Sequence, residues 1–561
     1  MITRIPDYTI GSIALLAFLL LLTQNTPFGD AHAKVYTILD TVVLLVFACD
    51  VICRFLAAKD RRAHLRQHII DLIVFIPLLQ YLPFLHTPLF DVLLRQGIIV
   101  VMLLSRSRKA AKLLSLLSLR PAQIMAIGFL GTIGIGTILL MLPAATVSGE
   151  RTALIDALFT STSAVCVTGL VVKDTAMHFS RLGQTIIMCL IQIGGLGIMT
   201  FSVSLAVFST KAMDVKQQAS FQDALDHDTL GDIVKLLRFI VLMTFGLEAI
   251  GAALLFMAWH GQFGSVWETA YHACFHAVSA FCNAGFSTFS DSLVRFRSDI
   301  TVNLTICLLI IAGGLGFMVI RDLLRLSLTP FRRAHKGSVH LKVQTKIVLT
   351  VTLLLIVVGA GLIYLAERNV GLASAAPRER ILLCIFQSVS PRTAGFNTMN
   401  IGNLQPATLL LIILLMFIGA SPGSTGGGIK TTTLATLWAT MKGLFKNREQ
   451  AELCRRTLPR ESVQKALAVL CLALVIVSGF AFALMLLEHK PFTAVLFETV
   501  SAFGTVGLST GITADLTVGG KVLIVVLMYL GRLGPLTLAY AMRRRNKPAQ
   551  YEYADERIMI G

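Results

Sequence analysis

Long and short apolar segments alternate along most of this chain. Four segments of about 20 residues, long enough to cross a hydrocarbon core of roughly 30 Å, lie near 121–142, 233–257, 347–365 and 465–487. Each is followed by an apolar segment too short to span, and these lie near 153–169, 269–285, 381–395 and 493–507. A half-helix with an extended return fits that length, and such broken backbone is tolerated at membrane depth only inside protein or along a watery cavity.

Each short segment ends in a glycine, and these glycines keep a nearly constant period. Gly169, Gly285, Gly395 and Gly507 follow one another at intervals of 116, 110 and 112 residues, each with Phe nine or ten places earlier and Ser five or six places earlier. A second marker, a glycine cluster, begins 24 to 28 residues after each of them, at 194–197, 313–316, 419–428 and 531–534. Small residues there permit close helix contact, and packing is the simpler interpretation of the first two clusters. Repetition at a fixed period is the signature of a repeat architecture.

The pattern therefore predicts an all-α polytopic membrane protein, with four pseudo-repeats of helix, re-entrant pore loop and helix around one pore. The expected boundaries are 113–225, 226–335, 336–455 and 456–561, the last including a C-terminal tail.

Residues 1–112 stand outside the repeat and offer four further helices, near 10–22, 35–56, 69–81 and 89–104. Asp50, Arg54 and Asp71 on the inner helices, with Arg106 and Arg108 ending the fourth, resemble a voltage-sensor module. Positive charge is missing between Arg95 and Arg106, so few charges could cross the field. A voltage sensor, a structural relic and a docking module all remain open interpretations.

Composition and charge support a membrane location. Hydrophobic residues make up 55% of the 561 and charged residues only 14%, against about 25% charged in a soluble protein. The net charge is +18, and the basic residues cluster in alternate loops. Retention of positive charge in the cytoplasm explains this pattern better than binding to nucleic acid does. We expect a multi-pass protein of the cell (inner) membrane with both termini cytoplasmic, whose basic face also meets anionic membrane lipids.

No residue cluster indicates an enzyme or a bound metal. The ten cysteines show neither metal spacing nor a paired framework, and His272 and His276 lack further ligands. A membrane-embedded enzyme or scaffold therefore has little support.

The four loop ends carry the chemistry of a potassium filter. Selecting K⁺ requires backbone oxygens that replace its hydration shell, and a glycine at each loop end adopts a positive φ without a Cβ clash. The last triplet reads Thr-Val-Gly, as potassium channel filters do. Four glycine turns without an ion are the alternative. The predicted ion-binding residues are Val167, Thr168, Gly169, Asn283, Ala284, Gly285, Thr393, Ala394, Gly395, Thr505, Val506 and Gly507.

Four stretches resemble a known family. They are Ser161 to Leu170, Ile191 to Gly197, Phe386 to Phe396 and Tyr529 to Thr537, and on them the chain from about 119 to 545 resembles the TrkH/KtrB superfamily of bacterial potassium uptake proteins, in particular its KtrB branch. The resemblance implies a homodimer with one pore per subunit, gated by a cytoplasmic RCK-type ring of nucleotide-binding regulatory subunits. It also implies a possible sodium dependence, no covalently bound cofactor and nucleotide only on the separate subunit.

The glycine-rich stretch 418–431 superficially resembles a phosphate-binding loop. Ile429 separates Gly428 from Lys430, and no strand precedes the stretch, so we reject nucleotide binding. A helix break that exposes backbone groups to a cavity fits better, and the family resemblance implies an intramembrane gating loop; a simple kink is the alternative. The predicted gating residues are Gly419, Ser421, Gly423, Ser424, Thr425, Gly426, Gly427, Gly428 and Arg532.

Arg532 lies deep in an apolar segment, where an ionisable side chain is costly and usually functional. Its register predicts a position near the gating loop, where a fixed charge would oppose cations. A structural ion pair with Glu498 is the alternative. Arg392 is expected to brace the outer pore.

The sequence thus predicts potassium uptake through a four-loop filter, gated by an intramembrane loop and by cytoplasmic subunits. The alternative function is a voltage-gated cation channel controlled by residues 1–112.

Overall fold

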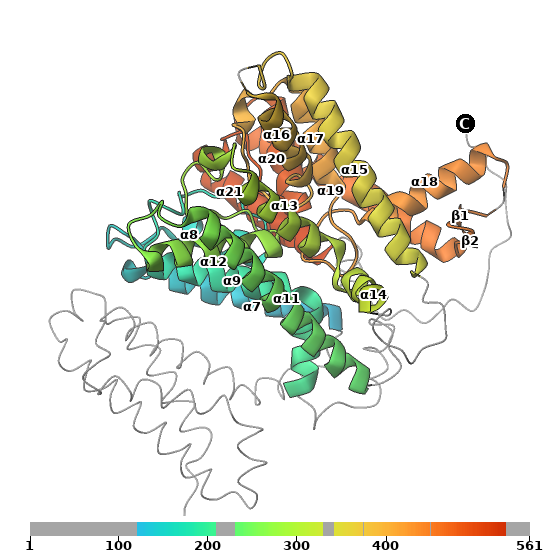
Figure 1. The fold of residues 1–561 in the computed structure, drawn as a ribbon, viewed down its shortest axis with the longest axis horizontal. Helices are drawn as coiled ribbons and strands as arrows, with labels where there is room; N and C mark the ends of the chain where they lie inside the picture. The colour runs from blue at the N-terminus through green and yellow to red at the C-terminus, as the bar shows by residue number, and fades with distance from the viewer. Residues whose placement is uncertain (1–120, 209–229, 329–340, 374, 449, 535–561) are drawn as a thin grey trace, which may run out of the picture.

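The structure is a computed structural model that describes residues 121–208, 230–328 and 341–534, apart from 374 and 449 (Figure 1). The predicted N-terminal unit, 1–112, lies outside the described residues, and so does the voltage-sensor hypothesis that rests on it. The described part is helical, as expected, and each of the four predicted repeats contains the same three elements.

The first element of each repeat is a long apolar helix. These helices are α7 (Pro121–Leu140), α11 (Leu230–Trp259), α15 (Val343–Glu367) and α19 (Arg460–Leu487). All four are long and apolar enough to cross a membrane, and their outward faces carry many exposed apolar side chains. Since no other described residue covers those faces, they are suited to contact lipid tails.

The second element is the short re-entrant helix. These helices are α8 (Leu154–Val165), α12 (Val266–Cys282), α16 (Pro377–Val389) and α20 (Phe492–Gly504). Ser265 caps α12 by accepting a hydrogen bond from the Glu268 amide, and Pro377 begins α16, both common helix starts. The last turns of all four helices are buried, so each carries its C-terminal end into the middle of the bundle.

The third element is a helix that breaks at a glycine. Helix α9 (Arg181–Phe208) kinks at Gly197, whose φ is 65°. The pair α13 (Ile300–Leu315) and α14 (Phe317–Leu328) meets at Gly316 with a bend of 105°. Helix α21 (Val518–Leu533) ends at Gly534, with φ 81°. In the third repeat, α17 (Pro406–Phe417) and α18 (Thr431–Phe445) are separated by residues 418–430.

The glycine clusters therefore do two things. A Cβ on Gly194, Gly313 or Gly531 would collide with a carbonyl oxygen near the end of the re-entrant helix of the same repeat. Close packing thus accounts for the first glycine of each of these clusters, as expected for the first two. The last glycine of each is where the helix breaks, because it adopts a positive φ, and packing alone did not predict that break.

Short elements connect the helices. Among the described residues, each repeat contains one 3₁₀ turn next to its re-entrant helix: η3 (Pro143–Ala145), η4 (Val294–Phe296), η6 (Ile401–Asn403) and η7 (Thr513–Asp515). A small antiparallel hairpin, β1 (Glu452–Leu453) and β2 (Arg456–Thr457), pairs Glu452 with Thr457. Figure 1 shows α18 and this hairpin projecting away from the rest of the bundle.

The first and fourth repeats lie side by side and close the bundle. Lys521 on α21 donates a 2.7 Å hydrogen bond to Asp156 in the first turn of α8. Tyr529 on α21 donates from its hydroxyl to the carbonyl of Ala126 on α7 at 2.8 Å. These contacts join residues far apart in sequence, and they give Asp156, which has no role in the sequence pattern, a structural one.

Candidate ion pathway

The four pore loops meet in one ring. A Cβ placed on Gly285 would lie 2.7 Å from the carbonyl oxygen of Ala394. In the same way, a Cβ on Gly169 would collide with the carbonyl oxygen of Ala284, one on Gly395 with that of Val506, and one on Gly507 with that of Thr168. Each glycine therefore touches the residue that precedes the glycine of the next repeat, and the fourth repeat touches the first. The twelve predicted filter residues thus come from four loops that surround a single axis.

The filter triplets, residues 167–169, 283–285, 393–395 and 505–507, share an unusual backbone. The glycines have φ between 69° and 92°, which confirms the expected positive φ. The first residue of every triplet, Val167, Asn283, Thr393 and Thr505, also has a positive φ, between 51° and 80°. Left-handed conformations are rare for non-glycine residues, especially β-branched ones. Backbone strain of this kind gathers at functional sites.

This backbone alternates in handedness, because the middle residue of each triplet is not among those with positive φ. In an ordinary strand successive groups point to opposite faces. Alternation between left- and right-handed conformations instead allows successive carbonyl groups to turn toward the same side. Four triplets of this kind can present stacked carbonyl oxygens to one axis.

The serine repeated before each glycine fixes the loop end. Ser163 accepts a 3.0 Å hydrogen bond from the Gly169 amide, and Ser501 accepts one of 3.1 Å from the Gly507 amide. In the middle repeats the hydroxyl instead donates to a carbonyl just beyond the glycine. Ser279 bonds Phe286 at 2.7 Å, and Ser390 bonds Phe396. The serine period seen in the sequence therefore reflects how each re-entrant helix holds its own loop.

A second layer of polar side chains supports the loops from behind. His276 contacts the hydroxyl of Ser287 at 3.0 Å, and Glu498 accepts a 2.9 Å hydrogen bond from Ser509. Both serines lie two residues beyond a filter glycine, so the two contacts are equivalent in the second and fourth repeats. Glu498 also accepts a hydrogen bond from Thr513. Glu498 therefore supports the fourth loop from behind. It forms no ion pair with Arg532, so that alternative is wrong.

The histidines do not form a metal site. His272 contacts Thr288 at 2.6 Å, again beside the second loop. Within the described ranges, no group of three or more His, Cys, Asp or Glu side chains could hold a metal ion.

Residues 418–430, which we call the intramembrane loop, lie against the first residues of the third and fourth filter triplets. The Gly427 amide donates a 3.1 Å hydrogen bond to the hydroxyl of Thr505, and a Cβ on Gly426 would collide with the hydroxyl of Thr393. The loop is also tied to the second repeat, because the Ser421 amide donates to the Gly314 carbonyl at 3.0 Å.

The loop is folded back on itself. Its two ends form a parallel bridge between Ile418 and Ile429, and the Gly419 amide donates to the Ile429 carbonyl at 2.9 Å. Thr431, the first residue of α18, donates to Ser421 at 3.0 Å. Ser421 and Thr425 are almost fully buried. These contacts make the intramembrane loop a compact polar unit inside the bundle. It is therefore more than a simple helix kink.

Two basic side chains form hydrogen bonds to the intramembrane loop. Arg532, 7% exposed, donates through Nη1 to the carbonyl of Thr425 and through Nη2 to the carbonyl of Gly194. It therefore joins the fourth repeat, the loop and the first repeat. Lys430 donates from Nζ to the carbonyl of Gly426 at 2.7 Å. Sequence reasoning used Lys430 only to reject a phosphate loop and did not assign it this position.

Arg392 lies beside the third filter triplet but does not enter the ring. It is buried, and it donates through Nη2 to the hydroxyl of Thr352 on α15 at 3.3 Å. This hydrogen bond gives Arg392 a bracing contact with α15, and its expected place at the outer pore stays a prediction.

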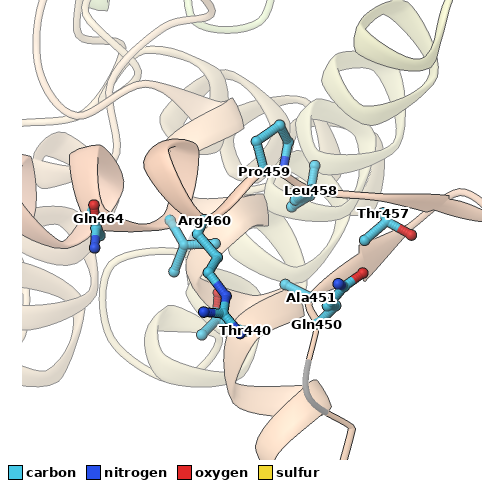
Figure 2. A pocket seen from close by; sticks show the side chains of 9 residues that line it. Thr440, Gln450, Ala451, Thr457, Leu458, Pro459, Arg460 and Gln464 are labelled. Atoms are coloured by element: carbon cyan, nitrogen blue, oxygen red, sulfur yellow. The ribbon is translucent and has the colours of Figure 1, made fainter.

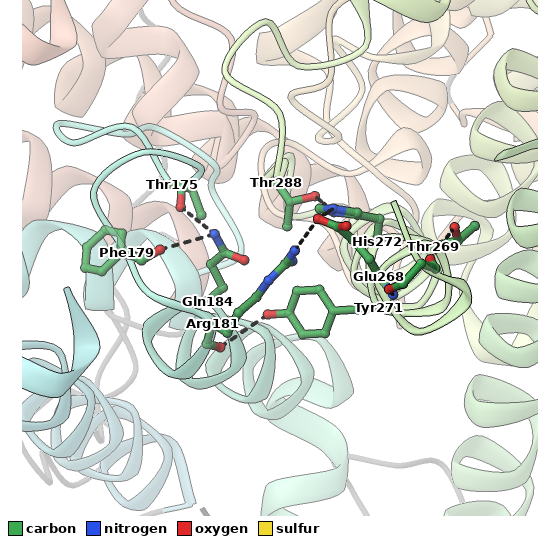
Figure 3. Close-up of polar contacts among 10 residues, drawn as sticks. Thr175, Phe179, Arg181, Gln184, Glu268, Thr269, Tyr271, His272 and Thr288 are labelled. Carbon is green, nitrogen blue, oxygen red and sulfur yellow. Dashed lines mark hydrogen bonds and ion pairs between the residues drawn. The ribbon is translucent and has the colours of Figure 1, made fainter. Parts of the chain in front are cut away.

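A polar network joins the first two repeats beside the loops (Figure 3). Arg181 at the start of α9 forms a 2.9 Å ion pair with Glu268 on α12, and its guanidinium lies 4.6 Å from the ring centre of Tyr271. Gln184 donates to the carbonyls of Thr175 and Phe179 at 3.1 and 3.2 Å. The network fixes the segment that follows the first filter triplet.

A second contact between the same repeats lies within the bundle. Gln192 donates a 3.1 Å hydrogen bond to Glu248, which is 5% exposed on α11. Sequence reasoning gave Glu248 no role, because its partner lies in another repeat.

Known proteins with similar sequence or structure point in one direction. The profile of the family described as TrkH, cation transport protein, matches residues 94–551. Ktr system potassium uptake protein B of Bacillus subtilis is 40% identical over 79% of this chain and 97% of its own length. Potassium/sodium uptake protein NtpJ of Enterococcus hirae is 39% identical over 79% of this chain and 98% of its own. The crystal structure of the potassium transporter TrkH from Vibrio parahaemolyticus has the same fold, with TM-score 0.58, 16% identity and coverage of 95% and 98% of the two chains.

Proposed function

Because the chain belongs to the TrkH family of cation transport proteins, we propose that it takes up potassium ions through the ring of four pore loops. The ion moves down its electrochemical gradient across the cell (inner) membrane. The protein is not an enzyme, since its family transports ions. The names of two relatives, a potassium uptake protein and a potassium/sodium uptake protein, support potassium as the transported ion.

The observation that carries this proposal is the closed ring of triplets with alternating backbone handedness. Carbonyl oxygens of the twelve filter residues would replace the hydration shell of K⁺ at the axis. The partially negative C-terminal ends of α8, α12, α16 and α20 would add to the attraction for a cation. Only the last triplet reads Thr-Val-Gly, so discrimination against Na⁺ is weaker than in a filter of four identical loops.

The intramembrane loop serves as the gate. An ion that has passed the filter meets the loop at Thr393 and Thr505, and the loop is closed by hydrogen bonds rather than by apolar packing. Arg532 adds a fixed positive charge. A unit charge about 6 Å from a cation at an effective dielectric of roughly 20 opposes it by about 3 kcal/mol.

We infer the assembly and its control from the resemblance to the family. The chain forms a homodimer with one pore per subunit, and a cytoplasmic RCK-type ring binds nucleotide and acts on the gate. The name of the Enterococcus relative, which pairs potassium with sodium, supports a dependence on sodium. Both chain ends are cytoplasmic, as the distribution of basic loops indicates.

Ion flux into proteoliposomes tests the proposal. The purified full-length protein should pass K⁺ faster than Na⁺ and should exclude choline. Deleting residues 421–427 should raise the flux while K⁺ remains preferred, because the filter loops are intact. Equal rates for K⁺ and choline would overturn the filter, whereas a folded deletion variant with unchanged flux would overturn the gate.

A further inference from the structure

A cavity of about 510 Å³ opens where α18, the β1–β2 hairpin and the start of α19 meet (Figure 2). It lies away from the ion pathway, on the projecting part of the chain. Its polar lining comes from Thr440 on α18, Gln450 and Thr457 beside or on the hairpin, and Arg460 and Gln464 on α19. Binding sites for small molecules and lipid headgroups have volumes of this order.

The lining is suited to an anion. It offers a guanidinium, two side-chain amides and two hydroxyls, and no Asp or Glu is among the described residues that line it. Arg460 makes no hydrogen bond or ion pair with another described residue, and Figure 2 shows its side chain extending toward Thr440. A guanidinium with neighbouring donors matches the oxygens of a phosphate.

The surroundings add charge of the same sign. Lys442, Lys446, Arg455 and Arg456 are exposed and form no ion pair with a described residue. The nearby acids Glu452 and Glu461 are paired with Arg448 and Lys465. Such a cluster beside the start of α19, a helix long and apolar enough to span, attracts anionic lipid.

Apolar side chains next to the cavity indicate a lipid rather than a soluble anion. Trp438 is 67% exposed and Phe445 87% exposed on α18, with Met441 and Leu444 exposed on the same helix. Exposed aromatic side chains beside cations, next to the start of the spanning-length helix α19, are typical of the membrane–water boundary. Acyl chains could lie along these side chains while the headgroup enters the cavity.

We propose that this cavity binds the phosphate headgroup of an anionic phospholipid from the leaflet on this side of the membrane. Arg460 is the main phosphate ligand, with Thr440 and Gln464 completing the contacts. The lipid would fix α18 relative to α19. Since α18 begins at Thr431, directly after the intramembrane loop and bonded to Ser421, the bound lipid would steady the loop; this last consequence rests on the proposed gate.

The test measures lipid retention by the full-length protein. Detergent-purified protein is titrated with phosphatidylglycerol or phosphatidylcholine, and bound lipid is counted by native mass spectrometry. We expect phosphatidylglycerol to be retained at least tenfold more strongly than phosphatidylcholine. Arg460→Gln should lower this preference by about tenfold. Lys465→Gln, which removes an equal charge one turn further along α19 and is paired with Glu461, should change it less than about twofold.

Thr457→Trp provides a second variant, because it fills the cavity from the exposed hairpin without changing charge; it too should abolish the preference. Equal loss in Lys465→Gln and Arg460→Gln would mean a diffuse charge effect and overturn the cavity. Displacement of lipid by millimolar glycerol phosphate or inorganic phosphate would overturn the lipid assignment in favour of a soluble phosphate. A protein that retains lipid in this pattern but fails to conduct K⁺ would contradict the proposed function and leave the cavity assignment intact.

Discussion

The Gly427 amide donates a 3.1 Å hydrogen bond to the Thr505 hydroxyl, and this bond joins the intramembrane loop to the fourth filter triplet. Thr505 is fully buried and has a φ of 51°. The residue that begins this filter triplet is therefore also a partner of the proposed gate. In that proposal, Thr505 is one of the side chains, with Thr393, through which the loop and the filter affect each other.

Replacing Thr505 with Val should loosen the closed loop. Val keeps the β-branched shape but leaves the Gly427 amide buried without an acceptor, which costs roughly 1–3 kcal/mol. We expect K⁺ flux in proteoliposomes to rise about fivefold or more. Thr505→Ser keeps the hydroxyl and should leave the flux near the wild-type value. If Ser and Val give the same flux, the hydrogen bond does not hold the loop.

Substitution of a filter glycine should impair K⁺ selection. Gly285→Ser and Gly395→Ser each place a Cβ at a positive φ, which costs roughly 1–2 kcal/mol, and each also pushes it against a carbonyl of the next loop. Half-saturation for K⁺ should rise about tenfold, measured by growth of a strain deficient in potassium uptake. Gly149→Ser is the matched control, since Gly149 has a φ of 73° but nothing within 4 Å of the added Cβ. Unchanged K⁺ affinity in both filter variants would refute the filter assignment.

Arg532 should restrain flux through both its charge and its shape. Its two terminal nitrogens bond carbonyls of different repeats, an arrangement that a lysine, with its single ammonium, cannot reproduce. Arg532→Gln should therefore increase the flux most, and Arg532→Lys should increase it partly. The comparison is made at low and high salt, because an electrostatic barrier reached by water weakens with ionic strength. Loss of transport in both variants at normal membrane yield would mean that Arg532 is only structural.

The ion pair between Lys521 and Asp156 should stabilise the closed ring. Both side chains are largely buried, and removing one partner of a buried pair costs about 3–5 kcal/mol. Lys521→Met should therefore lower the thermal midpoint of the detergent-solubilised protein by several degrees. Lys173→Met removes a half-exposed lysine 3.8 Å from the same carboxylate and should cost at most about 1 kcal/mol. Equal effects of the two variants would show that the ring does not depend on the pair.

The repeat architecture could be predicted from the sequence because its requirements recur. Glycine is needed four times where a loop ends, and the period survives even though the other filter residues differ. The family relationship was also predicted from the motifs and is confirmed by the matches over residues 94–551. The re-entrant helices could be predicted because their apolar segments are too short to span the membrane.

The remaining features depend on contacts between distant residues. Val167 and Thr505 have positive φ although β-branched residues usually avoid it. Residue propensities therefore do not predict this backbone conformation at either position. The partner of Arg532 was hard to identify because its acceptors are backbone carbonyls, which no side chain marks. Glu248 likewise gains its role from another repeat, through Gln192. Lys430 instead bonds the carbonyl of Gly426 within its own loop, a contact that depends on how the loop folds back. The two-residue strands of the hairpin are too short to leave a periodic pattern.

Among the described residues, the intramembrane loop interrupts only the second helix of the third repeat, while those of the first and second repeats break at single glycines and that of the fourth ends at Gly534. A pore built from four identical chains could not contain it, because four copies of this thirteen-residue segment would compete for the same space on the axis. Fusion of the repeats into one polypeptide removes that conflict, since each quarter can diverge separately. In the proposed mechanism, the obstruction and its release then belong to one segment per pore, and opening requires no concerted movement of four equivalent parts.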